Sequence, residues 1–155
     1  MTFCSVPLLV CICLTVFTAE ARANCARPVL AHQRQDPATI LRLETAWAVA
    51  YLTGDTEFER CLLTSDFTEI MSSGSINHLS EELALARKNS GKSVAGAAPM
   101  PSITVHTHGS VAVAYGISSE KLIAGKPHKS YFADYYFWEN GAWHVYFAQQ
   151  TSFAT

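Results

Sequence analysis

Residues 131–147 read YFADYYFWENGAWHVYF, and this stretch decides the fold class. Its centre, Asn140-Gly141, is a strong signal for the two-residue turn of a hairpin. Aromatic and β-branched residues crowd both sides of the turn, which is typical of strands that pack against a core. We therefore predict two antiparallel strands, at 129–139 and at 142–153.

Two further strands precede this hairpin, where the apolar residues recur with a period of two. They are predicted at 102–108 and at 111–123, with a turn at 108–109 between them. A shorter strand is predicted at 67–72. Residues 91–101 are rich in Gly, Ala and Pro, so we interpret them as a loop or flap within one domain.

The first half of the chain carries helical signals instead. An Asp-Pro pair at 36–37 is typical of a helix start, and apolar residues then follow at spacings of three and four up to Gly54. Asp55 caps a short second helix at 56–63, and a third helix starts at Ser80. The predicted fold class is α+β, with three N-terminal helices packed in a strongly curved antiparallel sheet.

The composition limits the classes of function. The 155 residues, 49% hydrophobic and 15% charged, are enough for one domain with a core. With 11 Lys and Arg against 13 Asp and Glu, the formal net charge is −2, so we expect no nucleic-acid partner. The sequence has no Gly-rich phosphate loop and no Cys/His cluster with ligand spacing, so we predict neither a cofactor nor a metal site.

The N-terminus predicts export. The apolar run at 6–17 is shorter than the roughly 20 residues that span a bilayer, and an Ala-x-Ala pattern follows it, so we predict cleavage near Ala23. The mature chain would then be periplasmic or secreted and would have no membrane span. A membrane anchor formed by the same run is the alternative. The predicted division of the chain is a signal peptide at 1–23, an irregular leader at 24–35 and a domain at 36–155.

Export changes the interpretation of the five cysteines. Three of them lie in the predicted signal peptide, and Cys25 and Cys61 remain. In an oxidising compartment two cysteines most simply form one disulfide, which would join the leader to the second helix. The alternative is a buried free thiol at Cys61, with Cys25 unpaired.

Several short motifs together resemble one superfamily. Trp47 is followed by a helix end at Gly54-Asp55, and the segments LLTSDFTEI (62–70), ADYYF (133–137) and NGAWHV (140–145) come after it, followed by a final QQTS. In this order the chain resembles the nuclear transport factor 2-like superfamily, which has a cystatin-like cone, and most of all the domain-of-unknown-function 4440 and SnoaL-like proteins. The superfamily contains isomerases, dehydratases, cyclases, kinase association domains and binding modules, so the resemblance implies a fold and leaves the function open.

The resemblance also implies which residues line the cone. It places Asp134 on the inward face, and the period of two then brings Tyr136 and Trp138 to that face. A carboxyl among these aromatic side chains would have a raised pKa and could donate a proton or a hydrogen bond, with a purely structural pairing as the alternative. The candidate catalytic residues are Asp134, with His144 or Glu69 as its base. The predicted pocket lining is Trp47, Tyr51, Met71, Val113, Tyr115, Ile117, Tyr136, Trp138, Tyr146, Ala148 and Gln150.

Three functions fit these observations. The first is binding of a small apolar or amphipathic molecule in the cone without chemistry. The second is an isomerase, cyclase or dehydratase with Asp134 as acid or oxyanion donor, and whether the chain is an enzyme stays open. The third is an interaction domain that holds no ligand. We expect a homodimer through the outer face of the sheet, on which the predicted aromatic patch is Tyr135, Phe137, Trp143, Val145 and Phe147.

Overall fold

The computed structural model describes residues 25, 27–91, 103–121 and 127–152. The expected signal peptide and nearly all of the expected flap lie outside these residues. The first helix, α1, is Pro37–Thr53. It begins and ends where the sequence predicts, because the Asp36 carboxylate accepts a hydrogen bond from the Thr39 backbone at 2.8 Å and Gly54 takes a left-handed conformation with φ of 75°.

Two shorter helices follow. Helix α2 is Thr56–Leu62, and the Asp55 carboxylate caps it by accepting from the backbone of Phe58 at 3.1 Å. Helix α3 is Leu79–Arg87, where the Glu81 carboxylate accepts from the backbone of His78 and so satisfies an N–H group at the helix start. None of the helices within the described residues is both long enough and apolar enough to cross a bilayer.

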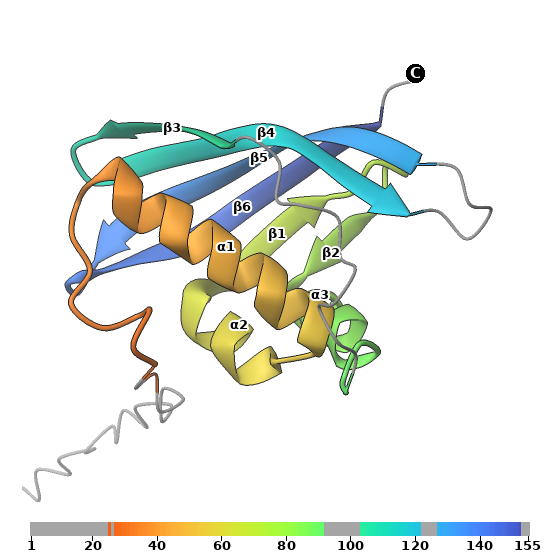
Figure 1. Cartoon of the computed structure of the whole chain (residues 1–155), viewed down its shortest axis with the longest axis horizontal. Coiled ribbons are helices and arrows are strands. Elements are labelled where there is room, and N and C mark those ends of the chain that lie inside the picture. Colours follow the sequence, from red (N-terminus) through yellow and green to blue (C-terminus); the bar gives the residue numbers. More distant parts are fainter. Residues whose placement is uncertain (1–24, 26, 92–102, 122–126, 153–155) are drawn as a thin grey trace, which may run out of the picture.

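Six strands form one open sheet in the order β2-β1-β6-β5-β4-β3 (Figure 1). Strands β3 to β6 pair antiparallel, so the predicted α+β class and the meander are confirmed. The sheet is mixed, however, because β1 pairs with β6 in parallel and β2 was not predicted. Such pairings depend on how distant segments meet, which the local pattern does not encode. The strands are β1 (Leu63–Ile70), β2 (Ile76–His78), β3 (Ile103–His108), β4 (Val111–Lys121), β5 (Pro127–Glu139) and β6 (Ala142–Ser152).

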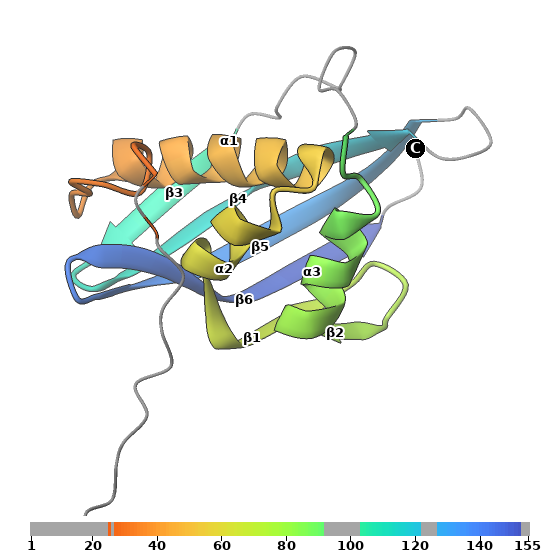
Figure 2. The ribbon, with the colours of Figure 1, turned by 90° about the horizontal axis from the view of Figure 1, so that it is seen from below.

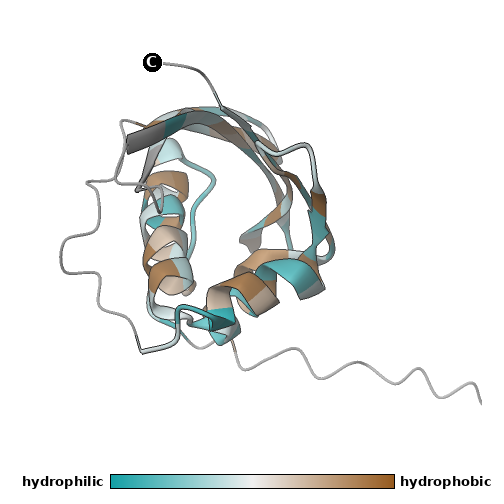
Figure 3. Cartoon of the chain, turned by 90° about the vertical axis from the view of Figure 1, so that its right-hand side faces the viewer, coloured by the Kyte–Doolittle hydropathy of each residue, from teal (hydrophilic) through white to brown (hydrophobic). Residues whose placement is uncertain are grey.

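The sheet curves around the helices, which all lie on its concave side (Figure 3). Helix α1 packs along β3 and β4, whereas α2 and α3 pack against β1 (Figure 2). The hairpin between β5 and β6 turns at Asn140-Gly141, and both residues have positive φ, as the predicted two-residue turn requires. The concave side of the sheet and the inner faces of the three helices therefore enclose the interior of the cone.

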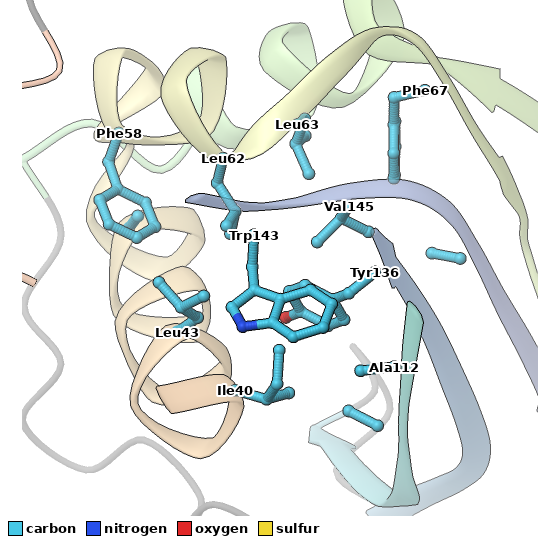
Figure 4. Close-up of a cluster of buried hydrophobic side chains, with 13 residues drawn as sticks. Ile40, Leu43, Phe58, Leu62, Leu63, Phe67, Ala112, Tyr136, Trp143 and Val145 are labelled. Atoms are coloured by element: carbon cyan, nitrogen blue, oxygen red, sulfur yellow. The ribbon is translucent and has the colours of Figure 1, made fainter. Parts of the chain in front are cut away.

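The core fills the end of the cone near the β5–β6 turn. Trp143 is fully buried there against Ile40 and Leu43 of α1 (Figure 4). The leader holds this tryptophan in place, because the side chain of Gln33 accepts from its backbone N–H at 2.8 Å and the carbonyl of Arg34 accepts from its indole N–H at 2.9 Å. The polar indole group is thus satisfied inside an apolar core.

A disulfide fastens the leader to α2. It joins Cys25 to Cys61, whose Cα atoms are 5.5 Å apart, and it is the pairing that the cysteine count favoured. The Arg27 guanidinium adds an ion pair at 2.9 Å to Asp55, the residue that caps α2. The described part of the leader is therefore a fixed portion of the domain.

Candidate functional site

Strand β5 presents its inward face as the sequence predicts. Tyr136 is fully buried and Asp134 is buried, while Trp138 packs against the core cluster. Alternate residues of β5 point outward, and the register brings Tyr135 opposite Phe147 of β6. The inward row of β5 is therefore one wall of the cone interior.

On β4 the prediction of the inward face was wrong. Ala112 and Ala114 are the buried residues, because they pair with Tyr136 and Asp134 across the ladder and therefore share the inward face. The larger side chains of this strand lie on the outer, convex face. A row of alanines allows α1 to approach the sheet closely, and bulky residues would prevent this. The predicted lining residues that lie outside the cone are Val113, Tyr115 and Ile117.

On β6 the prediction was wrong for one half of the strand. A bulge at Tyr146 shifts the register between Tyr135 and Tyr136, so the inward face changes from Trp143 and Val145 to Ala148 and Gln150. Ala148 and Gln150 are inward as predicted. Tyr146 is 40% exposed, and it stacks edge-on against outward-facing rings of β5. His144 lies opposite Phe137 on the outer face, so the structure does not bring His144 to Asp134.

The helix side contributes Trp47, which is half-buried and packs edge-on against Phe67 of β1 with ring centroids 6.1 Å apart. Tyr51, one turn later, is half-buried, and its carbonyl accepts from the side chain of Asn89 at 2.9 Å. Met71 is half-buried just beyond the end of β1. Of these three predicted lining residues, Trp47 is the one that the ring contact places against the interior.

A hydrogen-bonded group of acids lies inside the cone. The Tyr136 hydroxyl donates to the Glu44 carboxyl at 2.5 Å, and Glu44 also shares a hydrogen bond with Asp134. Burial raises the pKa of Glu44 to about 7, although the two hydrogen bonds lower it. Burial, reinforced by the charge of Glu44, raises the pKa of Asp134 well above its ordinary value of 3.8. Near neutral pH Asp134 is therefore the proton donor of this pair.

The same group continues toward α3. Glu69 on β1 accepts from the side chain of Gln150 at 3.0 Å and shares a hydrogen bond with Glu82 on α3. Burial first, and then the charge of Glu69, raises the pKa of Glu82 to about 8. The charges of Glu69 and Glu82 also act on Asp134, so these acids form one electrostatic unit across the interior. Of the residues that the structure describes, no cationic one lowers the pKa of Glu44, Glu82 or Asp134.

A fifth acid, Glu59 of α2, adjoins this unit through its charge effect on Glu82. It is fully buried, and among the residues that the structure describes neither oxygen of its carboxyl group has a hydrogen-bond partner. Burial raises its pKa to about 8, with the charge of Asp55 as the lesser cause. A buried polar group without a partner is costly, so Glu59 is an unsatisfied group at the edge of the acidic unit.

Sequence reasoning found Asp134 and Glu69 and missed the three helical acids. Glu44 lies on the same helix face as Ile40 and Leu43, and an acid within such an apolar stripe was the available signal. Glu59 and Glu82 also have buried apolar neighbours in sequence, but each helix is too short for its buried face to be read from spacing alone. Within the part of the chain that the structure describes, no three His, Cys, Asp or Glu side chains are arranged to hold a metal ion.

Solved structures share this architecture. A nuclear transport factor 2-like protein from Cytophaga hutchinsonii matches with a TM-score of 0.62 and 18% identity, over 77% of this chain and 100% of its own. A protein from Exiguobacterium sibiricum, proposed as a calcium/calmodulin-dependent kinase II association domain, matches with a TM-score of 0.60 and 21% identity, over 79% and 99%. The association domain of that kinase from C. elegans gives 0.56 and 15%, over 74% and 93%. No family model and no curated protein sequence matches this chain.

The chain has the nuclear transport factor 2-like fold. At identities this low the likeness shows the fold alone, because proteins of one fold carry many unrelated functions. The nuclear transport factor 2-like fold explains why the acids meet, since the bent sheet and α1 bring β1, β5 and all three helices around one interior.

The outer face of the nuclear transport factor 2-like sheet carries a broad aromatic surface. Rings of β5 and β6 contact one another, and the imidazole of His106 on β3 stacks on Tyr115 of β4 with centroids 5.7 Å apart. Trp143 and Val145 were predicted on this face, and they are instead buried on the inner one because of the bulge. We call the remaining set the outer aromatic face, which comprises Val111, Tyr115, Ile117, Tyr131, Tyr135, Phe137, Tyr146 and Phe147.

Proposed function

We propose that this chain is an exported binding protein of the SnoaL-like, domain-of-unknown-function 4440 kind. Its cone would hold the polar end of a small apolar or amphipathic molecule against the buried acids. The observation that carries the proposal is the acidic unit itself, in which five carboxyl groups, each at most 8% exposed, share one interior. Buried ionisable groups destabilise a fold unless they are paired, so a functional role for this set is the economical explanation.

The hydrogen bonds indicate what such a ligand would offer. Asp134 and Glu82 are held neutral, and each already donates its one O–H within the unit, Asp134 to Glu44 and Glu82 to Glu69. What these four acids can still offer is oxygen lone pairs, so a ligand hydroxyl or amino group would donate a hydrogen bond to them. The apolar remainder of the ligand would contact the aromatic side chains around it. Glu59, which is neutral at pH 7, could both donate to and accept from a ligand, since neither of its oxygens has a hydrogen-bond partner among the described residues.

Native mass spectrometry of the mature chain, exported by its own N-terminal segment, tests the proposal. We expect a reproducible non-covalent adduct on wild type and on Asp66→Asn, whose carboxyl is exposed on β1, and its loss from Asp134→Asn. Circular dichroism of both variants checks that they fold. A wild-type chain that stays at its unliganded mass, or an Asp134→Asn chain that keeps the adduct, would contradict ligand binding in the cone.

An enzyme is the second candidate, because Asp134 as acid and Glu69 as base lie in one acidic unit. Glu44, with a pKa of about 7, adds a group that can exchange protons near neutral pH. His144 has no place in this version, since it lies on the outer face. If the chain catalyses a reaction on the ligand that mass spectrometry reveals, Asp134→Asn should lower the turnover of that ligand by at least about 100-fold. Glu69→Gln should also lower turnover while leaving the fold unchanged.

A homodimer through the outer aromatic face is favoured by the exposure of large side chains there: 41% for Tyr115, 37% for Ile117 and 55% for Tyr131. Two solved structures of the same fold are a kinase association domain and a protein proposed as one. Light scattering should give a dimer for wild type and a monomer for Ile117→Lys. The matched control Leu52→Lys changes an exposed leucine of α1, on the concave side of the sheet, and should stay dimeric. A monomeric wild type would refute the interface.

A further inference from the structure

A concave site lies outside the cone, between the leader, the solvent side of α1 and the start of α2. It is a cavity of about 710 Å³, within the usual range of small-ligand pockets. None of the five acids described above lines it. Its lining is Arg27, Pro28 and Val29 of the leader, Leu41, Arg42, Thr45, Ala46, Val49, Ala50 and Thr53 of α1, and Asp55 and Phe58.

The floor of this cavity is an apolar strip along α1. Leu41 and Val49 are 39% and 44% exposed, which is high for branched aliphatic side chains in the middle of a helix. Thr45 and Thr53 lie in the same row, and each hydroxyl donates to a helix carbonyl four residues earlier, at 2.9 and 2.8 Å. Their polar atoms are therefore already satisfied. The row from Leu41 to Thr53 covers twelve residue steps, roughly 18 Å at 1.5 Å per residue.

The lining has two arginines and one aspartate, Arg27, Arg42 and Asp55, so its charges do not balance. Arg27 forms an ion pair with Asp55 at 2.9 Å and lies 3.9 Å from Glu57, so its charge is already compensated. Arg42 is the remaining charge, and it donates to the hydroxyl of Thr39 at 2.9 Å. Asp36 is the carboxylate that the charge of Arg42 reaches, but hydrogen bonds from Thr39 are the main cause of its lowered pKa, and its ion pair is with Arg34 at 3.3 Å. The cavity thus combines a long apolar strip with one net positive charge near the first turns of α1.

The walls of the cavity are fixed before any ligand arrives. The Cys25–Cys61 disulfide and the Arg27–Asp55 ion pair hold the leader beside α1 and α2. Val29 of the leader also packs on the core cluster. A wall held in this way costs little additional order on binding, which favours affinity.

We propose that this cavity binds a long-chain monocarboxylate, such as a free fatty acid. Its alkyl chain lies along Leu41, Ala46 and Val49, and its carboxylate pairs with Arg42. A guanidinium can hold both oxygens of a carboxylate, and a single unbalanced positive charge fits a single carboxylate. This site is separate from the proposed site in the cone, and the two can be tested independently.

Binding of cis-parinaric acid, a fluorescent long-chain carboxylate, to the full disulfide-bonded protein tests the proposal. We expect saturable binding to wild type. Leu41→Glu should weaken it at least tenfold, because it places a negative charge on the apolar strip. The control Leu52→Glu changes a leucine of the same helix with the same 39% exposure that does not line the cavity, and it should alter affinity less than twofold.

Two further measurements assign the carboxylate and the site. Arg42→Gln should weaken binding of the acid about tenfold, and it should leave displacement by the methyl ester of a fatty acid unchanged. A loss of acid binding in Asp134→Asn would place the acid in the cone and would overturn the proposal. No binding to wild type, equal effects of Leu41→Glu and Leu52→Glu, or binding to anionic vesicles without binding of the free acid would each overturn the proposal.

Discussion

Replacing Glu59 with glutamine should make the protein more stable at neutral pH. The carboxyl group of Glu59 is fully buried and has no hydrogen-bond partner within the described part of the chain, and burial raises its pKa from 4.5 to about 8. The folded state therefore keeps the proton that the unfolded chain releases above pH 4.5. The free energy of unfolding is therefore not reduced by this group below pH 4.5, and it falls as the pH rises from 4.5 toward 8. The side-chain amide that Glu59→Gln introduces carries no charge at any pH and escapes this loss.

The size of the effect follows from the pKa difference. Between the unfolded and the folded pKa of one such group, the free energy of unfolding falls by about 1.4 kcal/mol for each pH unit. At pH 7 the wild-type chain should therefore be about 3 kcal/mol less stable than Glu59→Gln, and at pH 5 less than about 1 kcal/mol. Glu44 and Glu82 are raised in the same direction, so the wild-type curve alone does not isolate Glu59. The difference between variant and wild type does isolate it.

Urea unfolding at pH 5 and pH 7, followed by tryptophan fluorescence, measures this difference, since Trp143 is fully buried in the fold. Glu57→Gln is the control, because Glu57 lies on the same helix with a side chain 84% exposed. It should shift stability by less than about 0.5 kcal/mol at both pH values. If Glu59→Gln and wild type differ by the same amount at pH 5 and pH 7, Glu59 is not held neutral by burial and the reasoning fails.

Three other substitutions have defined outcomes. Breaking the 36-residue disulfide loop by Cys25→Ser with Cys61→Ser should cost about 3–4 kcal/mol in urea unfolding. Gly54→Ala should lower the free energy of unfolding by about 1–3 kcal/mol, measured by urea unfolding. The reason is that Gly54 has a φ of 75° and that the new methyl carbon would lie 2.6 Å from backbone atoms beyond α3. Tyr136→Phe removes the buried hydrogen bond to Glu44 and should cost about 2 kcal/mol at pH 7, with a smaller loss at pH 5 where Glu44 is neutral.

The sequence alone was sufficient to predict helix ends and turns at positions where the backbone geometry permits few residue types. Asp36 and Gly54 mark the two ends of α1, and Asn140-Gly141 marks the last hairpin, because capping and positive φ restrict the choice of residue. The inward row of β5 was also predictable once Asp134 was placed, since the strand keeps a period of two from Asp134 to Trp138.

The faces of β4 and β6 were not predictable in the same way. Both faces of β4 are apolar, so the pattern does not say whether Ala114 or Tyr115 points inward. The answer depends on how closely α1 approaches the sheet. On β6 the bulge at Tyr146 changes the inward face in mid-strand, and the local sequence contains no pattern that predicts this bulge. The helical acids were missed for a similar reason, since their meeting depends on tertiary packing.

The arrangement of the acids also explains where the fold needs support. Glu59, the acid without a partner, lies on the seven-residue helix α2, which is too short to be stable by itself. The disulfide reaches this helix at Cys61, two residues beyond Glu59, and the Arg27 ion pair reaches its cap at Asp55. The stabilisation expected from the disulfide is similar in size to the cost of burying Glu59 at pH 7. Both terms act on one helix, so we expect the Cys25→Ser, Cys61→Ser chain to lose more stability at pH 7 than at pH 5 if α2 loosens around Glu59.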